Sequence, residues 1–153
     1  MDLYTNQQLG MDLKIISYNC RSARLHFDII KILAEQCDIL MLQETLLNDE
    51  NISILENIDD FNVAHTPSIR KNNTFVGRSK GGLVVMWRNF PHINIFPLHC
   101  NERVMGLKIH NDGFVYMILN VYLPCDYQTD DCFVEYLNNI AAIKDTISSE
   151  NYD

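Results

Sequence analysis

The sequence predicts a mixed α/β domain in which a β-sheet carries helices on one face. Two apolar runs, Leu13–Asn19 and Ile39–Gln43, flank a segment with helical periodicity, Leu25–Gln36. Strand, helix and strand at this spacing predict a right-handed crossover between two parallel strands. Further runs of strand character follow at hairpin-like spacing: Leu83–Trp87, Ile93–Leu98, Val104–His110 and Phe114–Leu123.

The remaining segments add smaller elements. Phe61–His65 is a weak strand candidate, and the preceding polar stretch Asn48–Asp60 has short amphipathic content. Asn111-Asp112-Gly113 is typical of a tight turn. Asp131–Ile147 predicts a closing amphipathic helix, with Asp130 and Asp131 as N-cap candidates. Few segments remain to cover the second face of the sheet, so we expect a covering layer to be missing.

The composition of the chain argues against several classes of protein. The 153 residues are 47% hydrophobic, which suits one domain with a real core, and the net charge is -8. That charge argues against a simple nucleic-acid coat, although a local basic surface can coexist with an acidic total. The chain has five cysteines, an odd number, and no Cys-x-x-Cys pair, which argues against a zinc module and against a disulfide framework.

The N-terminal residues indicate no targeting segment. Met1–Gly10 is polar and lacks an apolar signal core, and no apolar run approaches the roughly 20 residues of a membrane span. We therefore expect a soluble intracellular protein. Residues 1–11 are expected to form a flexible tail, because Met11 is an alternative start, and residues 12–153 the domain.

Two polar side chains follow the two apolar runs. Asn19 ends the first run and Glu44 follows the second. Parallel strands end on the same side of a sheet, so these side chains should converge there. A carboxylate beside an amide provides the oxygen ligands that Mg²⁺ prefers. The alternatives are a solvated glutamate and an asparagine bonded to backbone in a strand-exit turn.

Four motifs in order carry a family resemblance: Ile16-Ser17-Tyr18-Asn19, Leu42-Gln43-Glu44-Thr45, Gly81-Gly82-Leu83-Val84-Val85 and Asn120-Val121-Tyr122-Leu123-Pro124. This order resembles the endonuclease/exonuclease/phosphatase superfamily, and most closely the endonuclease domain of non-LTR (LINE-type) retrotransposons. The resemblance implies a DNase I-like fold, a two-sheet β-sandwich flanked by helices, of which residues 12–153 are approximately the first half. The family's Gly-Asp-x-Asn motif, a later metal-binding acid and a final Asp-His pair are not in this sequence.

The resemblance also implies roles for three residues. Glu44 corresponds to the family's Mg²⁺-binding glutamate, with Mn²⁺ as a substitute metal. Asn19 corresponds to the first-strand asparagine. Tyr122 corresponds to the tyrosine of the Tyr-x-Pro run, whose phenol can orient a phosphate oxygen; the alternative is a half-buried aromatic with its hydroxyl at the rim. Cys125 stands where some relatives have an asparagine after the proline, which puts a phosphate contact there in doubt.

A basic stretch, Arg70–Arg88, begins after the second motif and extends past the third. It contains Arg70, Lys71, Arg78, Lys80 and Arg88 and no acidic residue. Such a local positive surface suits a DNA backbone, and a solvated loop is an equal alternative.

These observations lead to two classes of function. The first is a Mg²⁺-dependent phosphodiester hydrolase, a DNA-nicking endonuclease of a retrotransposon, nuclear when functional and followed by a reverse transcriptase domain. A phosphatase or phospholipid phosphodiesterase of the same superfamily is a variant of it. Since half of the site is missing, we expect residues 1–153 to be inactive alone. The second class is a non-catalytic remnant or a binding or dimerisation module, because an exposed apolar sheet face favours self-association.

Overall fold

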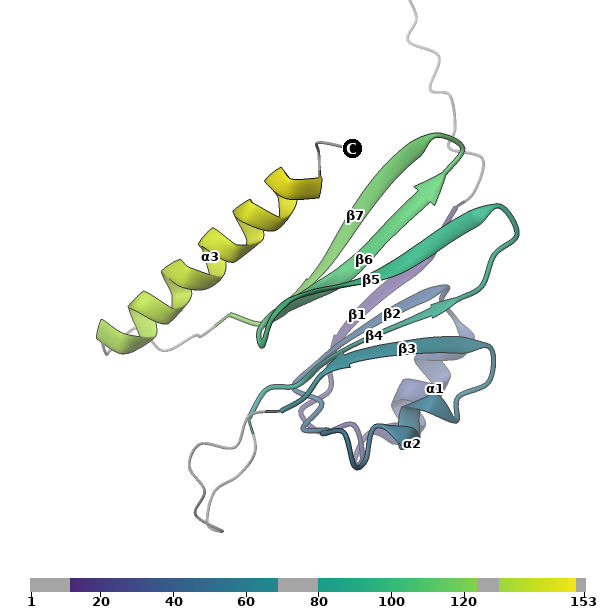
Figure 1. Ribbon diagram of the computed structural model, residues 1–153. Coiled ribbons are helices and arrows are strands. Elements are labelled where there is room, and N and C mark those ends of the chain that lie inside the picture. Colours follow the sequence, from purple (N-terminus) through teal and green to yellow (C-terminus); the bar gives the residue numbers. More distant parts are fainter. Residues whose placement is uncertain (1–11, 69–79, 124–129, 151–153) are drawn as a thin grey trace, which may run out of the picture.

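Two β-sheets pack face to face, with helices on both outer faces (Figure 1). The computed structural model describes residues 12–68, 80–123 and 130–150. The first sheet has the strand order β1-β2-β4-β3, with β1 (Ile15–Asn19), β2 (Ile39–Gln43), β3 (Phe61–Thr66) and β4 (Leu83–Arg88). The second has the order β5-β6-β7, with β5 (Ile93–Asn101), β6 (Val104–Asn111) and β7 (Phe114–Val121). The helices are α1 (Phe27–Glu35), α2 (Ser53–Glu56) and α3 (Asp130–Glu150).

The predicted crossover is confirmed. Strands β1 and β2 are parallel neighbours, joined by α1, and Asn19 is in register with Gln43 at their carboxyl ends. Strand β4 pairs antiparallel with β2, so its first residue, Leu83, lies opposite Gln43. Asn19, Gln43 and Leu83 therefore meet at one end of the first sheet.

The expectation of a single sheet with one uncovered face is wrong. Strands β5, β6 and β7 do not extend the sheet of β4; they form a separate antiparallel sheet that covers its second face. The fold class, a two-sheet sandwich flanked by helices, is confirmed. The predicted turn is also confirmed, because Asn111 pairs with Phe114 across Asp112 and Gly113, whose φ angles are 47° and 82°.

The helices differ from expectation mainly at their ends. α1 is shorter than the predicted Leu25–Gln36, and α3 is longer than the predicted Asp131–Ile147. Asp130 and Asp131 lie inside the first turn of α3, so the N-cap assignment for them is wrong. Acidic residues still suit this position, because the amino end of a helix carries partial positive charge.

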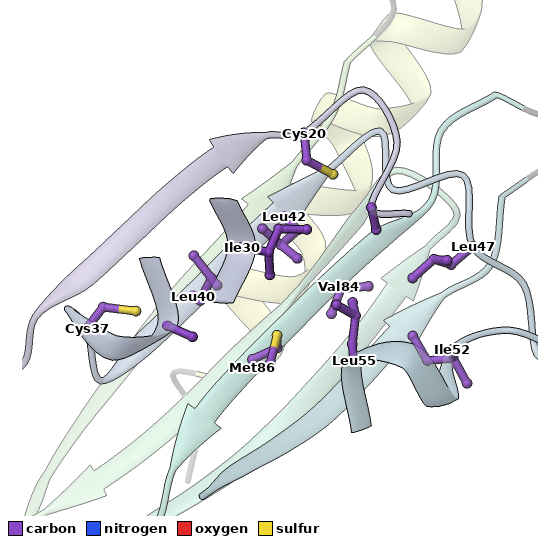
Figure 2. Packing of buried hydrophobic residues seen from close by; sticks show 12 residues of the cluster. Cys20, Ile30, Cys37, Leu40, Leu42, Leu47, Ile52, Leu55, Val84 and Met86 are labelled. Carbon is purple, nitrogen blue, oxygen red and sulfur yellow. The ribbon is translucent and has the colours of Figure 1, made fainter. Parts of the chain in front are cut away.

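Two apolar cores fill the spaces between the layers. One lies between the helices and the first sheet and includes Ile30, Leu42 and Leu55 (Figure 2). The other lies between the sheets, where Met41 and Trp87 face Leu107. Every residue of β2 is buried, since both of its faces are covered.

Two simpler expectations can be compared directly. The thiols of Cys20 and Cys37 are buried, and that of Cys100 is half-buried. None of the helices in the described ranges combines the length and apolarity needed to cross a membrane.

Candidate functional site

The structure brings Asn19 and Glu44 together. The side-chain amide of Asn19 donates from Nδ2 to Glu44 Oε1 at 2.9 Å, and its Oδ1 accepts the backbone N–H of Arg21 at 3.3 Å. Asn19 is exposed and Glu44 half-buried, so the pair lies at the surface of the sheet end. Within the described part of the chain, Glu44 Oε2 makes no hydrogen bond or ion pair, which leaves it available to a ligand.

Backbone bonds to neighbouring segments hold the Glu44 loop. The N–H groups of Thr45 and Leu46 donate to the carbonyls of Gly82 and Gly81, both at 3.1 Å, and Ala23 N donates to Thr45 O at 2.9 Å. Glu44 and Leu46 have φ angles of 53° and 56°, a left-handed conformation that is costly for residues other than glycine. The surrounding bonds therefore fix a strained loop, and with it the direction of the carboxylate.

Gly82 permits this close approach. It has a φ of 84°, and a Cβ at its position would lie 2.6 Å from Thr45 Oγ1 and 3.3 Å from Leu46 N. Gly81 has a similar φ of 76°, but nothing lies within 4 Å of the place a Cβ would take. The two glycines thus share a backbone conformation and differ in the space around them.

A buried polar bridge links the two sheets beside Glu44. Gln43 Nε2 donates to Asn120 Oδ1 at 2.6 Å and to Ser17 Oγ at 3.0 Å. Asn120 Nδ2 donates to the carbonyls of Leu42 and Val84, both at 3.0 Å. Asn120 is 1% exposed and Gln43 8%. The sequence motifs contain both residues, but their contact was not predicted.

Tyr122 lies on the second sheet, just beyond the end of β7. It is half-buried at the rim of the inter-sheet core, and its backbone N–H donates to Arg103 O at 2.9 Å. The Arg103 guanidinium lies 5.6 Å from the centre of its ring and is ion-paired with Glu135 of α3. Tyr122 follows Asn120 by two residues, so the inter-sheet bridge connects its strand end to that of Glu44.

The basic stretch is only partly described. Arg70, Lys71 and Arg78 lie outside the described residues, whereas Lys80 is exposed beside Gly81. Arg88 does not belong with them: it lies at the opposite end of β4, where its guanidinium donates to the carbonyls of Cys37 and Ala34. Its expected place in a DNA-binding surface is therefore wrong, because those bonds tie it to the end of α1.

The Glu44 carboxylate fits a hard divalent cation. Mg²⁺ commonly takes one or two carboxylates and keeps several waters, and Asn19 restrains this carboxylate through Nδ2 while its own Oδ1 accepts the Arg21 N–H. No cluster of three or more histidine, cysteine or acidic side chains suited to a metal is found among the described residues. Among the described residues of the sheet end, Glu44 is the side chain that would hold such an ion.

Comparisons with known proteins bear on the fold. No family model matches this chain, and no curated protein matches it significantly. Three solved structures are similar to it. An AP endonuclease from Leishmania major has 18% sequence identity and a TM-score of 0.57, and the match covers 72% of this chain and 40% of that chain. A 3′ phosphatase from Neisseria bound to product DNA hairpin has 19% identity and a TM-score of 0.64, with 91% of this chain and 52% of that chain covered, and the human Nocturnin catalytic domain with bound sulfate has 13% identity and a TM-score of 0.58, with 87% and 60% covered.

The chain has the DNase I-like fold. At these identities the likeness concerns the arrangement of the chain and not its chemistry. The matched region spans only 40–60% of each solved chain, so this sequence corresponds to part of the complete fold seen there.

Substituting the two glycines separates steric fit from backbone conformation. Gly82→Ala should destabilise the protein by about 1–3 kcal/mol more than Gly81→Ala, because only its Cβ collides with the Glu44 loop. Urea unfolding measures this difference, and the backbone amide resonances of Thr45 and Leu46 should move only in Gly82→Ala. Equal effects of the two substitutions would contradict the proposed contact.

The buried thiols predict a loss of stability at high pH. Burial raises the pKa of Cys20 to about 11, and burial likewise raises the pKa of Cys37 to about 11. Because the unfolded chain loses these protons at lower pH, their contribution to stability is present below about pH 9 and is lost as the pH rises through about 11. In urea unfolding across that window, the double variant Cys20→Ala/Cys37→Ala should lose less stability than the parent. An identical pH slope would refute this.

Proposed function

We propose that this chain supplies the metal-binding part of a Mg²⁺-dependent phosphodiester hydrolase that nicks DNA, of the kind carried by non-LTR retrotransposons. The observation that carries the proposal is the Asn19–Glu44 pair at the carboxyl ends of β1 and β2. It gives one oriented carboxylate with a free oxygen, at the sheet end where the motifs predicted a metal ligand.

Each residue has a task in this proposal. Glu44 would hold the cation, while Asn19 restrains Oε1 and so fixes the carboxylate plane. Mg²⁺, when bound, polarises a phosphoryl oxygen and stabilises charge on the leaving group. Tyr122 contributes a phenol from the second sheet, which is suited to donating a hydrogen bond to phosphate.

DNA is the substrate that several features favour. Lys80 is exposed directly before the glycines that hold the Glu44 loop, and a basic side chain there suits a phosphate backbone. One solved structure of this fold holds a product DNA hairpin. The retrotransposon assignment rests on the style of the sequence motifs, and a phosphatase or phospholipid phosphodiesterase remains the alternative within the superfamily.

Metal binding by Glu44 can be measured without catalysis. Mn²⁺ should broaden the side-chain amide resonance of Asn19 in the chain 1–153, and Glu44→Gln should lower the Mn²⁺ affinity by at least about 100-fold. Loss of an outer partner alone typically costs about 10–100-fold, so loss of the ligand costs more. Glu50→Gln is the matched control, because Glu50 is an exposed glutamate of the same loop.

The same samples test completeness of the site. We expect no Mg²⁺-dependent nicking of supercoiled plasmid by 1–153, because the groups of the family's second half are not in this sequence. Robust nicking that Glu44→Gln abolishes would show that the chain carries a whole active site. Equal Mn²⁺ affinity of the parent and Glu44→Gln would remove the basis of the proposed metal role.

A second candidate function, a self-association module, is favoured by the open sheet edges. Among the described residues, strands β1 and β7 each have one neighbour, and a hollow of about 320 Å³ lined by Ile15, Tyr116 and Met117 lies between them. Strand β7 contains no proline or charged residue, whereas β5, the opposite edge, carries Pro97 and an irregularity at His99. Uncharged edges of this kind tend to pair with another chain.

Sedimentation tests this candidate with two matched lysine substitutions. Val115 on β7 is 49% exposed and Phe96 on β5 is 52% exposed. If chains associate through β7, Val115→Lys should weaken self-association by about tenfold, while Phe96→Lys leaves it unchanged. A monomeric parent at all concentrations would contradict the candidate, as would equal effects of both substitutions.

A further inference from the structure

We propose that Asn120 is a positioning residue for the candidate site, which through Gln43 fixes the strand end carrying Glu44 relative to the one carrying Tyr122. The inference rests on the proposed function for the task of Glu44 and Tyr122. The geometry on which it stands is independent of that task.

One side chain of the second sheet ties together three strands of the first. Asn120 of β7 accepts from Gln43 of β2 at 2.6 Å and donates to Leu42 O of β2 and Val84 O of β4 at 3.0 Å. Gln43 passes the connection on to Ser17 of β1, at 3.0 Å. Both amide hydrogens of each side chain thus have acceptors.

The bridge occupies the last layer of the inter-sheet core. Gln43 follows Met41 on the inward face of β2, and Asn120 follows Ile118 on the inward face of β7, so each is the next inward position after an apolar residue. Apolar contacts are non-directional and leave the relative shift of two sheets loosely defined. A short buried hydrogen bond is directional and removes that freedom.

The bridge is adjacent in sequence to the candidate site on both sheets. Glu44 comes directly after Gln43, and Tyr122 comes two residues after Asn120. The hydroxyl of Thr66 also reaches across the sheets, to Met105 Sδ at 3.8 Å, but a thioether is a weak acceptor. The bonds of Asn120 to Gln43 and to the carbonyls of Leu42 and Val84 are therefore the contacts that set the separation of the two strand ends.

A double-mutant cycle separates positioning from stability. Gln43→Met and Asn120→Leu each remove one partner, so each should lower the urea midpoint by leaving a buried polar group unsatisfied. The pair Gln43→Met/Asn120→Leu replaces both partners by apolar groups of similar shape, and its midpoint should recover most of the loss. Ser17→Ala is the control, because it removes only the exposed branch of the network.

The positioning role is measured on the recovered pair variant. We expect the Asn19 side-chain amide and the Tyr122 resonances to shift although the protein is stable, and the Mn²⁺ affinity to fall about 10-fold or more. Parent-like resonances at both residues in the stable pair variant would overturn the proposal. If the pair variant is unfolded, Asn120→Leu alone gives the same readout, because it removes all three bonds of Asn120 to the first sheet while Gln43 keeps its bond to Ser17.

Mn²⁺ binding and the metal-free resonances distinguish a failure of the positioning role of Asn120 from a failure of the metal role of Glu44. If Mn²⁺ has no effect on the parent, the metal role of Glu44 fails, and the metal-free resonances of Asn19 and Tyr122 still decide the positioning role. If Mn²⁺ binds the parent and the pair variant equally, with unshifted resonances, the metal role survives and the positioning role is refuted.

Discussion

The burial of β2 on both faces is the constraint on which the other features depend. Its five residues contact either the helices or the second sheet, and none is exposed. A polar group inside such a strand would cost free energy unless it were fully hydrogen-bonded. Chemistry is therefore possible only where the strand ends, and this is where Gln43 is satisfied by Asn120 and where Glu44 reaches the surface.

The cost of this arrangement is concentrated in the loops at that end. Arg21, Glu44 and Leu46 all have positive φ angles, and their loops are joined by backbone bonds to each other or to Gly81 and Gly82. Strained backbone persists only where the surroundings over-determine it. The strain is thus carried by well-packed neighbours, including the buried Cys20 and Ala23, and the carboxylate of Glu44 gains a fixed direction in exchange.

Sequence patterns predicted the β1–α1–β2 unit, whereas the contacts between distant segments became apparent only in the structure. The β1–α1–β2 unit and the Asn19–Glu44 pair follow from apolar runs with polar ends, because the crossover rule places parallel strand ends together. Hairpin-like spacing between β4 and β5 could not show that the chain changes sheets there. The Gln43–Asn120 bond joins residues 77 positions apart, and its only local trace is a polar residue at an inward strand position.

The candidate site lies beside two of the open sheet edges. Asn19 ends β1 and Tyr122 follows β7, and in the described chain each of these strands forms one edge of its sheet, with β3 and β5 at the opposite edges. A strand added to either edge would begin or end beside one of these residues, so pairing at the edge and contacts at the candidate site would affect each other. The two apolar cores are well filled, so they hold both strand ends in place without an added strand.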